Sequence, residues 1–294
     1  MATIYTYQGQ NVRRTWLLMT TFFILVILIG FIFSQIYDNQ NILYFCVIFS
    51  ILMNIFSYWN SDKIALSLAK AHPVTREKYF DLYTTVENLA ITAGLPTPKI
   101  YVINDQAPNA FATGRDKKHA VIAVTTGLLA IMNKTELEGV IAHEMSHIGN
   151  RDMLVSTVAV VLAGFISILA DVMMRATLFG DHDNNRGNGI FAIIGIALAI
   201  IAPIFASLLQ LAISRKREYL ADASGVLLTR YPEGLASALE KLKNYGRPMK
   251  NQSSAIAHLY ISNPLGEGKL AKKTKQLFFT HPLIEDRIRI LRSM

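Results

Sequence analysis

The chain has 294 residues, and its 29 Lys and Arg against 21 Asp and Glu give a formal net charge of +8. Hydrophobic residues make up 52% of the sequence and charged residues only 17%, whereas an ordinary soluble domain carries about 25% charged residues. This composition excludes a disordered chain, and the single Cys excludes a disulfide-stabilised scaffold. The positive charge is set among long apolar runs, which indicates a membrane protein and not a nucleic-acid-binding one.

The first two predicted elements are apolar helices that are long enough to cross a membrane. Trp16–Phe33 and Ile42–Trp59 contain no charged residue, and a crossing takes about 20 residues of helix. Arg13 and Arg14 precede the first stretch, whereas the loop between the two carries neither Lys nor Arg, which assigns the N-terminus to the cytoplasm. The first stretch is too long for the apolar part of a signal peptide, so we expect a retained anchor and a membrane hairpin over residues 1–60.

A hydrophilic segment that is expected to fold, residues 61–152, comes next. Apolar residues at helical spacing predict a helix over Thr75–Ala93. Lys99–Asn104 and His119–Thr126 are rich in Val and Ile and are predicted as strands. Between them, the sequence PNAFATG of Pro108–Gly114 is compatible with an edge strand or with a turn.

The following helix carries the residues best suited to chemistry. It is predicted to begin at Thr135, with Glu138 completing a capping box. His143 and His147 stand four residues apart, so their imidazoles emerge from one face of the helix and can bind one metal ion. Glu144 lies beside them, where it can take a proton from water at the metal without being a ligand. The alternative is a surface helix with two solvated histidines, because HExxH also arises by chance.

Two further apolar stretches, Met153–Met174 and Ile190–Ile213, predict a second membrane hairpin over residues 153–213. In the tail that follows, residues 214–294, basic residues outnumber acidic ones, so the tail and the first hydrophilic segment are both assigned to the cytoplasm. Buried helices of a large soluble core are the alternative, but four such apolar runs, with Asp171 as their one charged residue, are rare in soluble proteins. The chain is therefore expected to cross the membrane four times.

The third metal ligand is expected shortly after the second hairpin, because a catalytic zinc site has three protein ligands and HExxH supplies two. Glu218 follows the fourth apolar stretch at about the membrane depth of His147. Asp222, one helical turn later, can accept a hydrogen bond from the free N–H of a ligand histidine. The alternative for Glu218 is an ion pair with Arg215 or Arg217.

The rest of the tail predicts two helices and a long loop. Pro232 opens and Gly246 closes the first helix, and His281–Leu291 carries the second. Arg247–Gln276 is polar and basic, which is typical of a mobile loop. Four of its lysines are close together and are expected either to be solvated or to rest on anionic lipid headgroups: Lys269, Lys272, Lys273 and Lys275.

Several longer motifs occur together in this chain. HEMSH is followed by an apolar hairpin and then by SRKREYLADASG, and the chain also contains PNAFATG, ELEGVIAHEMSH and THPLIEDRI. In this combination the chain resembles the HtpX family of membrane zinc endopeptidases, relatives of the CAAX prenyl proteases. The resemblance runs from about residue 60 to the C-terminus, and the two N-terminal spans are placed as in that family.

The resemblance implies one zinc ion per chain, with His143, His147 and Glu218 as ligands and Glu144 as general base. The expected fold class is α+β: a mainly helical multi-pass membrane protein with four transmembrane helices and a cytoplasmic, zincin-like metalloprotease domain that carries a small β-sheet. In this scheme residues 61–152 and 214–294 form the two parts of the protease.

Four further roles come from the resemblance alone. It implies that Asp222 supports the zinc site and that Arg287 braces it. It implies that His281 stabilises the oxyanion and that Asn109 binds the substrate backbone. In the residues themselves, His281 is one of seven histidines and carries no signal of its own.

The expected function is zinc-dependent cleavage of cytoplasmic segments of misfolded or unfolded membrane proteins, a form of quality control in the bacterial plasma membrane. The expected partners are these substrates and the lipid bilayer, with no nucleic acid. A CAAX-type prenyl-protein protease is the alternative enzyme, but it needs a large lipid-accessible chamber that four spans are too few to enclose. The non-enzymatic alternative, a scaffold or transporter subunit with a structural zinc site, would need a fourth protein ligand or ionisable residues within the spans.

Overall fold

The structure is a computed structural model, and it describes residues 4–36, 38–159, 161–162, 215–250, 256–264 and 282–294. The chain divides into two compact units. We call the first the sheet unit; it comprises Met1–Val12, Asp62–Thr157 and Ile213–Met294. The second, which we call the apolar unit, comprises Arg13–Ser61 and Val158–Ala212.

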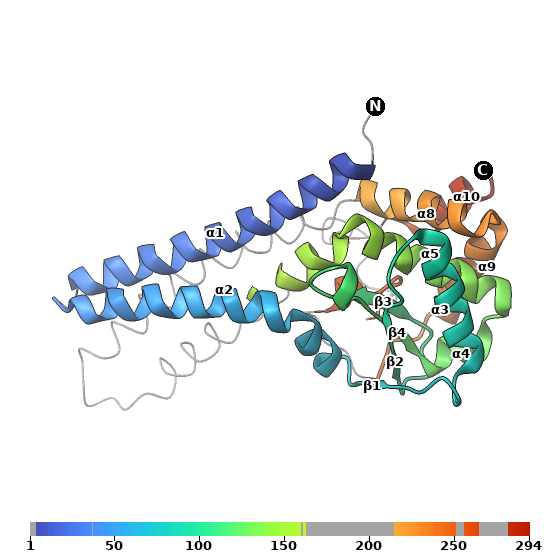
Figure 1. Ribbon diagram of the computed structural model, residues 1–294, viewed down its shortest axis with the longest axis horizontal. Helices are drawn as coiled ribbons and strands as arrows, with labels where there is room; N and C mark the ends of the chain where they lie inside the picture. The colour runs from blue at the N-terminus through green and yellow to red at the C-terminus, as the bar shows by residue number, and fades with distance from the viewer. Residues whose placement is uncertain (1–3, 37, 160, 163–214, 251–255, 265–281) are drawn as a thin grey trace. The chain divides into compact units, whose positions relative to one another are not determined.

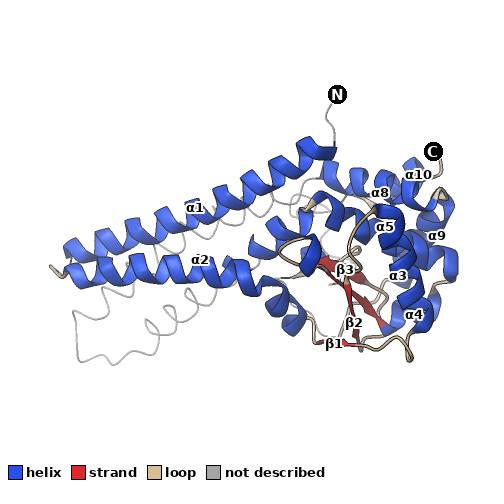
Figure 2. Ribbon diagram, viewed as in Figure 1, coloured by secondary structure: helices blue, strands red, loops and turns tan. Residues whose placement is uncertain are grey.

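A four-stranded mixed sheet lies in the sheet unit (Figure 2). Its strands, in spatial order, are β1 (Ala71–Pro73), β2 (Lys99–Ile103), β4 (Val121–Thr125) and β3 (Ala110–Thr113). The central strands β2 and β4 run parallel, with Lys99 opposite Val121, and each outer strand pairs antiparallel with its neighbour. The two Val- and Ile-rich stretches are thus the central strands, and PNAFATG contributes the outer strand β3.

Helices cover this sheet, and the helix with HEMSH is the central one (Figure 1). Among the described residues, the helices that lie wholly within this unit include α3 (Phe80–Ala93), α4 (Thr126–Ile131), α5 (Lys134–Asn150), α8 (Arg215–Thr229), α9 (Pro232–Tyr245) and α10 (Ile284–Leu291). Helix α5 contacts α3, α8, α9 and strand β3. Its apolar residues Val140, Ile141 and Ile148 are fully buried in the core of the unit. The motif is therefore held on a core helix.

The start of α5 differs from the prediction. Asn133, not Thr135, is the N-cap, and it forms a complete capping box with Glu136. The Asn133 side chain accepts the backbone N–H of Glu136 at 2.9 Å, and the Glu136 carboxylate accepts the backbone N–H of Asn133 at 2.8 Å. The Thr135 hydroxyl donates to the Asn133 side chain instead. The predicted box of Thr135 and Glu138 has the same spacing, two residues out of register.

Part of the predicted loop Arg247–Gln276 is packed onto the sheet. Residues 256–264 contain a 3-10 turn, Ala257–Leu259, and bury Ile256, Tyr260 and Ile261. The backbone N–H of Ile261 donates to the carbonyl of Ala110 in β3 at 2.9 Å, and the Tyr260 ring lies edge-on to Phe111. This segment is part of the core and not a solvated loop, because its apolar side chains cover the outer strand.

Two long apolar helices begin the chain, α1 (Ile4–Ile36) and α2 (Gln40–Leu68). Within them, Gly9–Ile32 and Gln40–Leu68 are long and apolar enough to cross a membrane, yet only 28% and 11% of their most apolar windows are buried. A core helix of a soluble protein would be mostly buried, so this exposure fits contact with lipid. In the apolar unit a Cβ at Gly30 would lie 2.5 Å from that of Cys46, which shows that the two helices approach closely there.

The predicted third and fourth spans fall largely outside the described residues. Residues 153–159 and 161–162, at the start of the third predicted span, are helical. The remainder of Met153–Met174 and all of Ile190–Ile213 lie beyond the described part of the chain. The structure therefore supplies two candidate membrane helices, α1 and α2, among the residues that it describes.

Candidate active site

The two histidines of HEMSH face each other on α5. Their Nε2 atoms are 3.2 Å apart, as expected for residues one helical turn apart on the same face. His143 is only 1% exposed and His147 is partly buried. The alternative interpretation, a surface helix with two solvated histidines, is therefore wrong.

Helix α8 brings Glu218 to the same point. Its Oε2 atom is 3.8 Å from Nε2 of His143, and its Oε1 atom is 3.6 Å from Nε2 of His147. One ligand atom from each of the three residues lies within 4.8 Å of the others. Two imidazoles and a carboxylate are the donor set of many catalytic zinc sites, so the residues brought together here fit a metal ion.

The other ring nitrogen of each histidine is engaged by a carboxylate. Nδ1 of His143 is 2.9 Å from Oδ1 of Asp222, and Nδ1 of His147 is 3.2 Å from Oδ2 of Asp152. A hydrogen bond from Nδ1–H to a carboxylate fixes the tautomer that leaves the Nε2 lone pair available. Both lone pairs are then directed into the space that faces Glu218, which is the arrangement that a metal ion requires.

Arg287, which is completely buried, binds Asp222 from α10. Its Nε and Nη2 atoms donate to the two carboxylate oxygens at 2.8 and 2.7 Å, a bidentate pair. Burial raises the pKa of Asp222, but the charge of Arg287 and the hydrogen bonds from His143 and Arg287 outweigh it and lower the pKa to about 2. Nη1 of Arg287 is also 3.6 Å from Glu218, so this one side chain contacts two of the acidic groups of the site.

Glu144 is buried beside the three possible ligands. Burial, the largest effect, raises the pKa of its carboxyl, which the charges of His143 and His147 oppose. The backbone N–H of Ala112 in β3 hydrogen-bonds to the Glu144 carboxyl and links it to the outer strand. A carboxyl group whose pKa is raised is better suited to accepting a proton and returning it.

Burial and the surrounding carboxylates have opposite effects on the pKa of His147. Burial lowers its pKa, but the hydrogen bond with Asp152 and the charges of Glu218, Asp152 and Glu144 outweigh this effect and raise the pKa to about 9. The site thus concentrates negative charge around its two imidazoles. Such an environment stabilises any cation, a proton or a metal ion, that binds there.

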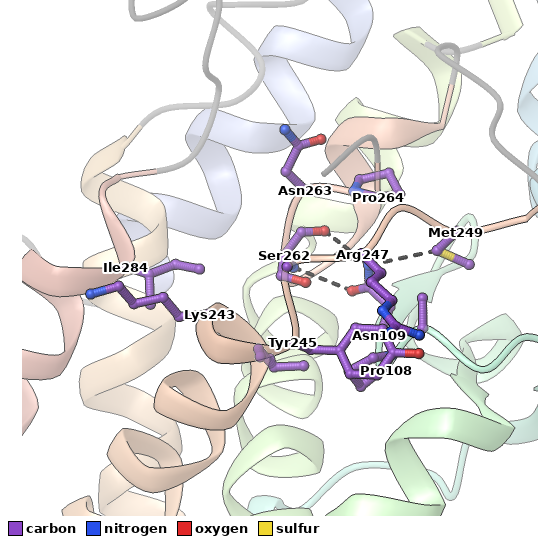
Figure 3. Close-up of a pocket in the computed structure, with 13 residues that line it drawn as sticks. Pro108, Asn109, Lys243, Tyr245, Arg247, Met249, Ser262, Asn263, Pro264 and Ile284 are labelled. Atoms are coloured by element: carbon purple, nitrogen blue, oxygen red, sulfur yellow. Dashed lines mark hydrogen bonds between the residues drawn. The ribbon is translucent and has the colours of Figure 1, made fainter. Parts of the chain in front are cut away.

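Asn109 lies one residue before β3 and is hydrogen-bonded to Ser262, in the segment 256–264. Its Nδ2 donates to the carbonyl of Ser262 at 2.9 Å and contacts the sulfur of Met249 at 3.7 Å (Figure 3). Its Oδ1 accepts the backbone N–H of Ser262 at 3.3 Å and that of Ala110 at 3.1 Å. Only 2% of Asn109 is exposed. Its amide therefore serves contacts within the protein in this structure.

The remaining predicted residues lie outside the described part of the chain. They are His281 and the four lysines of the basic cluster: Lys269, Lys272, Lys273 and Lys275.

The contacts of Asp152 with His147 and of Asn11 with Asp152 were not predicted. Asp152 is five residues after His147, beyond the end of α5, so the helical spacing that relates ligands and supports does not include it. The one feature of the sequence that could have indicated this contact is the presence of an acidic residue soon after HExxH. Asn11 offers no signal in the sequence, because its contact joins two distant segments.

Comparison with known proteins identifies the family. Residues 76–294 match the family model described as Peptidase family M48. The chain is 50% identical to a "Protease HtpX homolog" of Caldanaerobacter subterraneus subsp. tengcongensis, an alignment that covers 99% of this chain and 98% of the relative. A second "Protease HtpX homolog", from Thermoanaerobacter pseudethanolicus, is 47% identical with the same coverage. The chain belongs to the HtpX family.

A solved structure shows the same fold. The crystal structure of S. mikatae Ste24p aligns with a TM-score of 0.51 over 91% of this chain, at 20% sequence identity, and the chain spans 62% of that protein. Membership of the HtpX family makes this chain a membrane-bound metalloendopeptidase. The cluster of His143, His147 and Glu218 and the two apolar helices are consistent with that activity and that location.

Proposed function

We propose that the metal is zinc, that one ion per chain is held by His143, His147 and Glu218, and that Glu144 is the general base. The observation that supports this most is the convergence of three ligand atoms while both Nδ1 atoms are held by carboxylates. Two histidines and one glutamate leave a coordination position open, which is typical of catalytic zinc. When bound, zinc supplies a Lewis acid for the scissile carbonyl and lowers the pKa of water to about 7.

The residues of the chain supply the proton transfers. Glu144 accepts a proton from the attacking water and later returns it to the nitrogen of the leaving amine, so one carboxyl serves both steps. The Ala112 N–H holds that carboxyl beside the ligands. Arg287 keeps Asp222 ionised, and Asp222 in turn holds the ring of His143. Burial of these groups strengthens each of these interactions relative to water.

Glu144→Gln tests this assignment. The variant, purified as the full chain in detergent, should bind one equivalent of zinc, because Glu144 is not a ligand. It should cleave casein about 10²- to 10⁴-fold more slowly than the wild type, the usual contribution of a general base. Removal of the metal with a chelator should abolish cleavage by the wild type, and added zinc should restore it. A Glu144→Gln variant that cleaves as fast as the wild type would show that another group is the base.

We also propose that the substrates are cytoplasmic segments of misfolded or unfolded membrane proteins. The support is chemical: the reacting groups are buried, so a peptide must be extended to present its carbonyl, and the chain is anchored beside such substrates by its apolar helices. Cleavage of an unfolded membrane protein but not of its folded form, with no requirement for a prenylated cysteine, is the expected result. Strict dependence on a prenyl group would indicate the CAAX-type reaction instead.

The proposed topology has four crossings of a bacterial plasma membrane, with the active site in the cytoplasm. Apart from α1 and α2, it rests on the sequence pattern of apolar stretches and basic residues. Replacing the one cysteine, Cys46, by Ala permits a labelling test in intact cells. A new cysteine at Asn39, between the two helices, should react with a membrane-impermeant maleimide, whereas one at Lys117 should react only after lysis. The reverse labelling pattern would show that the proposed topology is inverted.

A further inference from the structure

Asp152 lies where the chain turns at the end of the HEMSH helix. Helix α5 ends at Asn150, and Arg151 adopts the left-handed conformation with φ of 58°, a turn that brings the next side chain back toward the helix. Asp152 is only 6% exposed, and its Oδ2 atom lies 3.2 Å from Nδ1 of His147. The carboxylate therefore approaches the second histidine from the side opposite to Nε2.

The other carboxylate oxygen of Asp152 accepts a hydrogen bond from one side chain of the sheet unit and lies near the positive charge of a second. Asn11 in α1 donates from Nδ2 to Oδ1 of Asp152 at 2.6 Å and also to the carbonyl of Asn150 at 2.9 Å. Since an amide nitrogen carries two hydrogens, both bonds can form at once. Nη1 of Arg217, from α8, is 3.4 Å from the same oxygen and provides a positive charge beside it. Asn11, like Asp152, is buried.

We propose that Asp152 is a positioning residue for the metal ligand His147, and that Asn11 fixes Asp152 in that role. The inference rests on the proposed function, since it assigns the support of a ligand in the same metal site. Asp152 does for His147 what Asp222 does for His143: it accepts Nδ1–H, sets the ring orientation and leaves Nε2 directed at the metal. The N-terminal residues of α1 are thereby part of the protease.

Asp152→Asn is the direct test, because it preserves shape and removes charge. In the full chain in detergent it should weaken zinc binding about 10- to 100-fold, the usual cost of losing such a support. The visible spectrum of the cobalt-substituted protein should also change, since it reports the ligand geometry. Asp152→Glu, which keeps a carboxylate, should recover part of the affinity.

Asp116→Asn is the matched control. Asp116 also holds the Nδ1 atom of a histidine, His119, at 2.8 Å, but this pair is exposed and is not part of the metal site. The control should leave zinc affinity and the cobalt spectrum unchanged. Equal losses in the two variants, or an Asp152→Asn variant with wild-type affinity and spectrum, would overturn the proposal.

Asn11→Ala tests the second half of the proposal without touching a charged group. It should weaken zinc binding in the same direction as Asp152→Asn but by less. Combined with Asp152→Asn it should add little, because Asn11 acts through Asp152. Additive losses would show that Asn11 acts by another route. This variant also keeps the proposal testable if Asp152→Asn lowers the unfolding temperature of the metal-free protein.

These outcomes are separable from failure of the proposed function. If the wild type binds no zinc, or if His143→Ala leaves zinc binding intact, the metal site itself is wrong. If the wild type binds zinc and His143→Ala loses it while Asp152→Asn does not, the site stands and only the role of Asp152 is overturned.

Discussion

At the scale of single residues, the two carboxylates that contact the Nδ1 atoms of the histidines each have an arginine beside them. Asp222 is paired with Arg287, and Asp152 lies 3.4 Å from Arg217. Burying an unpaired charge costs several kcal/mol. The two arginines therefore make it possible to bury the aspartates that contact the Nδ1 atoms of the two histidines. Removing one member of either pair should therefore affect folding as well as metal binding, and the two effects need separate measurements.

Glu218 and Asp222 should differ in the way that their loss affects the metal. Glu218→Ala removes one of the three proposed ligands, so zinc occupancy and proteolysis should disappear together at low free metal. Asp222→Asn keeps all three ligands and should weaken zinc binding about 10- to 100-fold without abolishing it. Zinc titration against a competing chelator, with casein cleavage at saturating zinc, separates the two. Full occupancy in Glu218→Ala would mean that another residue, with His281 as the first candidate, completes the site.

At the scale of elements, close helix packing determines where the ligands lie. Helix α8 carries Glu218, and its Gly225 faces α5, where an added Cβ would lie only 3.1–3.3 Å from backbone atoms of Ala142 and His143. Such a contact is tighter than van der Waals distance, so the helices would have to separate by a few tenths of an ångström. The glycine therefore sets the spacing between the two helices that carry the proposed metal ligands.

Gly225→Ala should weaken zinc binding by up to about tenfold, the lower end of the effects of disturbing the surroundings of a metal. Gly149→Ala is the matched control: it also replaces a helical glycine, on α5, but its Cβ would be 3.8 Å from its nearest neighbour, an ordinary contact. Because Ala favours a helix over Gly by about 0.5–1 kcal/mol, the control should not lose stability. Equal zinc affinity in both variants would refute a spacing role for Gly225.

Asn109 joins two elements, the outer strand β3 and the segment 256–264. Asn109→Ala should lower the free energy of unfolding by about 1–3 kcal/mol, because it leaves the buried polar groups of Ser262 and Ala110 without these bonds. Thermal or chemical denaturation measures this loss. If Asn109 acts instead mainly on substrate, as its resemblance to the family pattern implies, stability should be unchanged and only KM should rise.

The sequence predicted the elements and residues that local rules determine. The i, i+4 spacing correctly predicted that His143 and His147 lie on one face of a helix. The Val and Ile content correctly predicted the two central strands. It did not find β1, which has three residues and ends in Pro73 at the outer edge of the sheet, where proline is tolerated. It also misplaced the start of α5, because two capping boxes of equal spacing were possible. In the structure Glu136 is buried and bonded to Lys241, a contact between distant segments.

The same limit explains what was missed around the metal. Asp152 follows a residue in the left-handed conformation, Arg151, so helical periodicity no longer predicts where its side chain lies. Its partner Asn11 is 141 residues earlier in the sequence. The whole stretch Arg247–Gln276 was predicted as a polar loop, yet its part 256–264 buries three apolar side chains: Ile256, Tyr260 and Ile261. Long-range pairing of this kind is decided by the fold and cannot be read from local pattern.

At the scale of the whole molecule, the chain couples a buried metal site to a membrane anchor. Large apolar side chains such as Trp16, Phe45 and Trp59 are more than half exposed on α1 and α2. Aromatic and aliphatic side chains in such numbers are stable only in contact with lipid or with other apolar segments. If its substrates are membrane proteins, as proposed above, a protease anchored in this way meets them at high local concentration, since both diffuse in one plane.

The basic cluster in the tail gives a test of this coupling. Its four lysines are Lys269, Lys272, Lys273 and Lys275, which lie outside the described residues. If they rest on anionic headgroups, each contributes about 1 kcal/mol of attraction, which fades beyond a Debye length of about 8–10 Å. Reversing all four to Glu should then slow cleavage of a membrane-embedded substrate in anionic vesicles.

The same variant should cut a soluble unfolded peptide in detergent at the wild-type rate, and the difference between the two substrates should shrink as salt is raised. Neutral vesicles of phosphatidylcholine provide the control, because the lysines then have no surface charge to meet. Equal loss on both substrates would point to a folding or metal-site defect. No loss on either would mean that the lysines are solvated and that the apolar helices alone position the protease at the membrane.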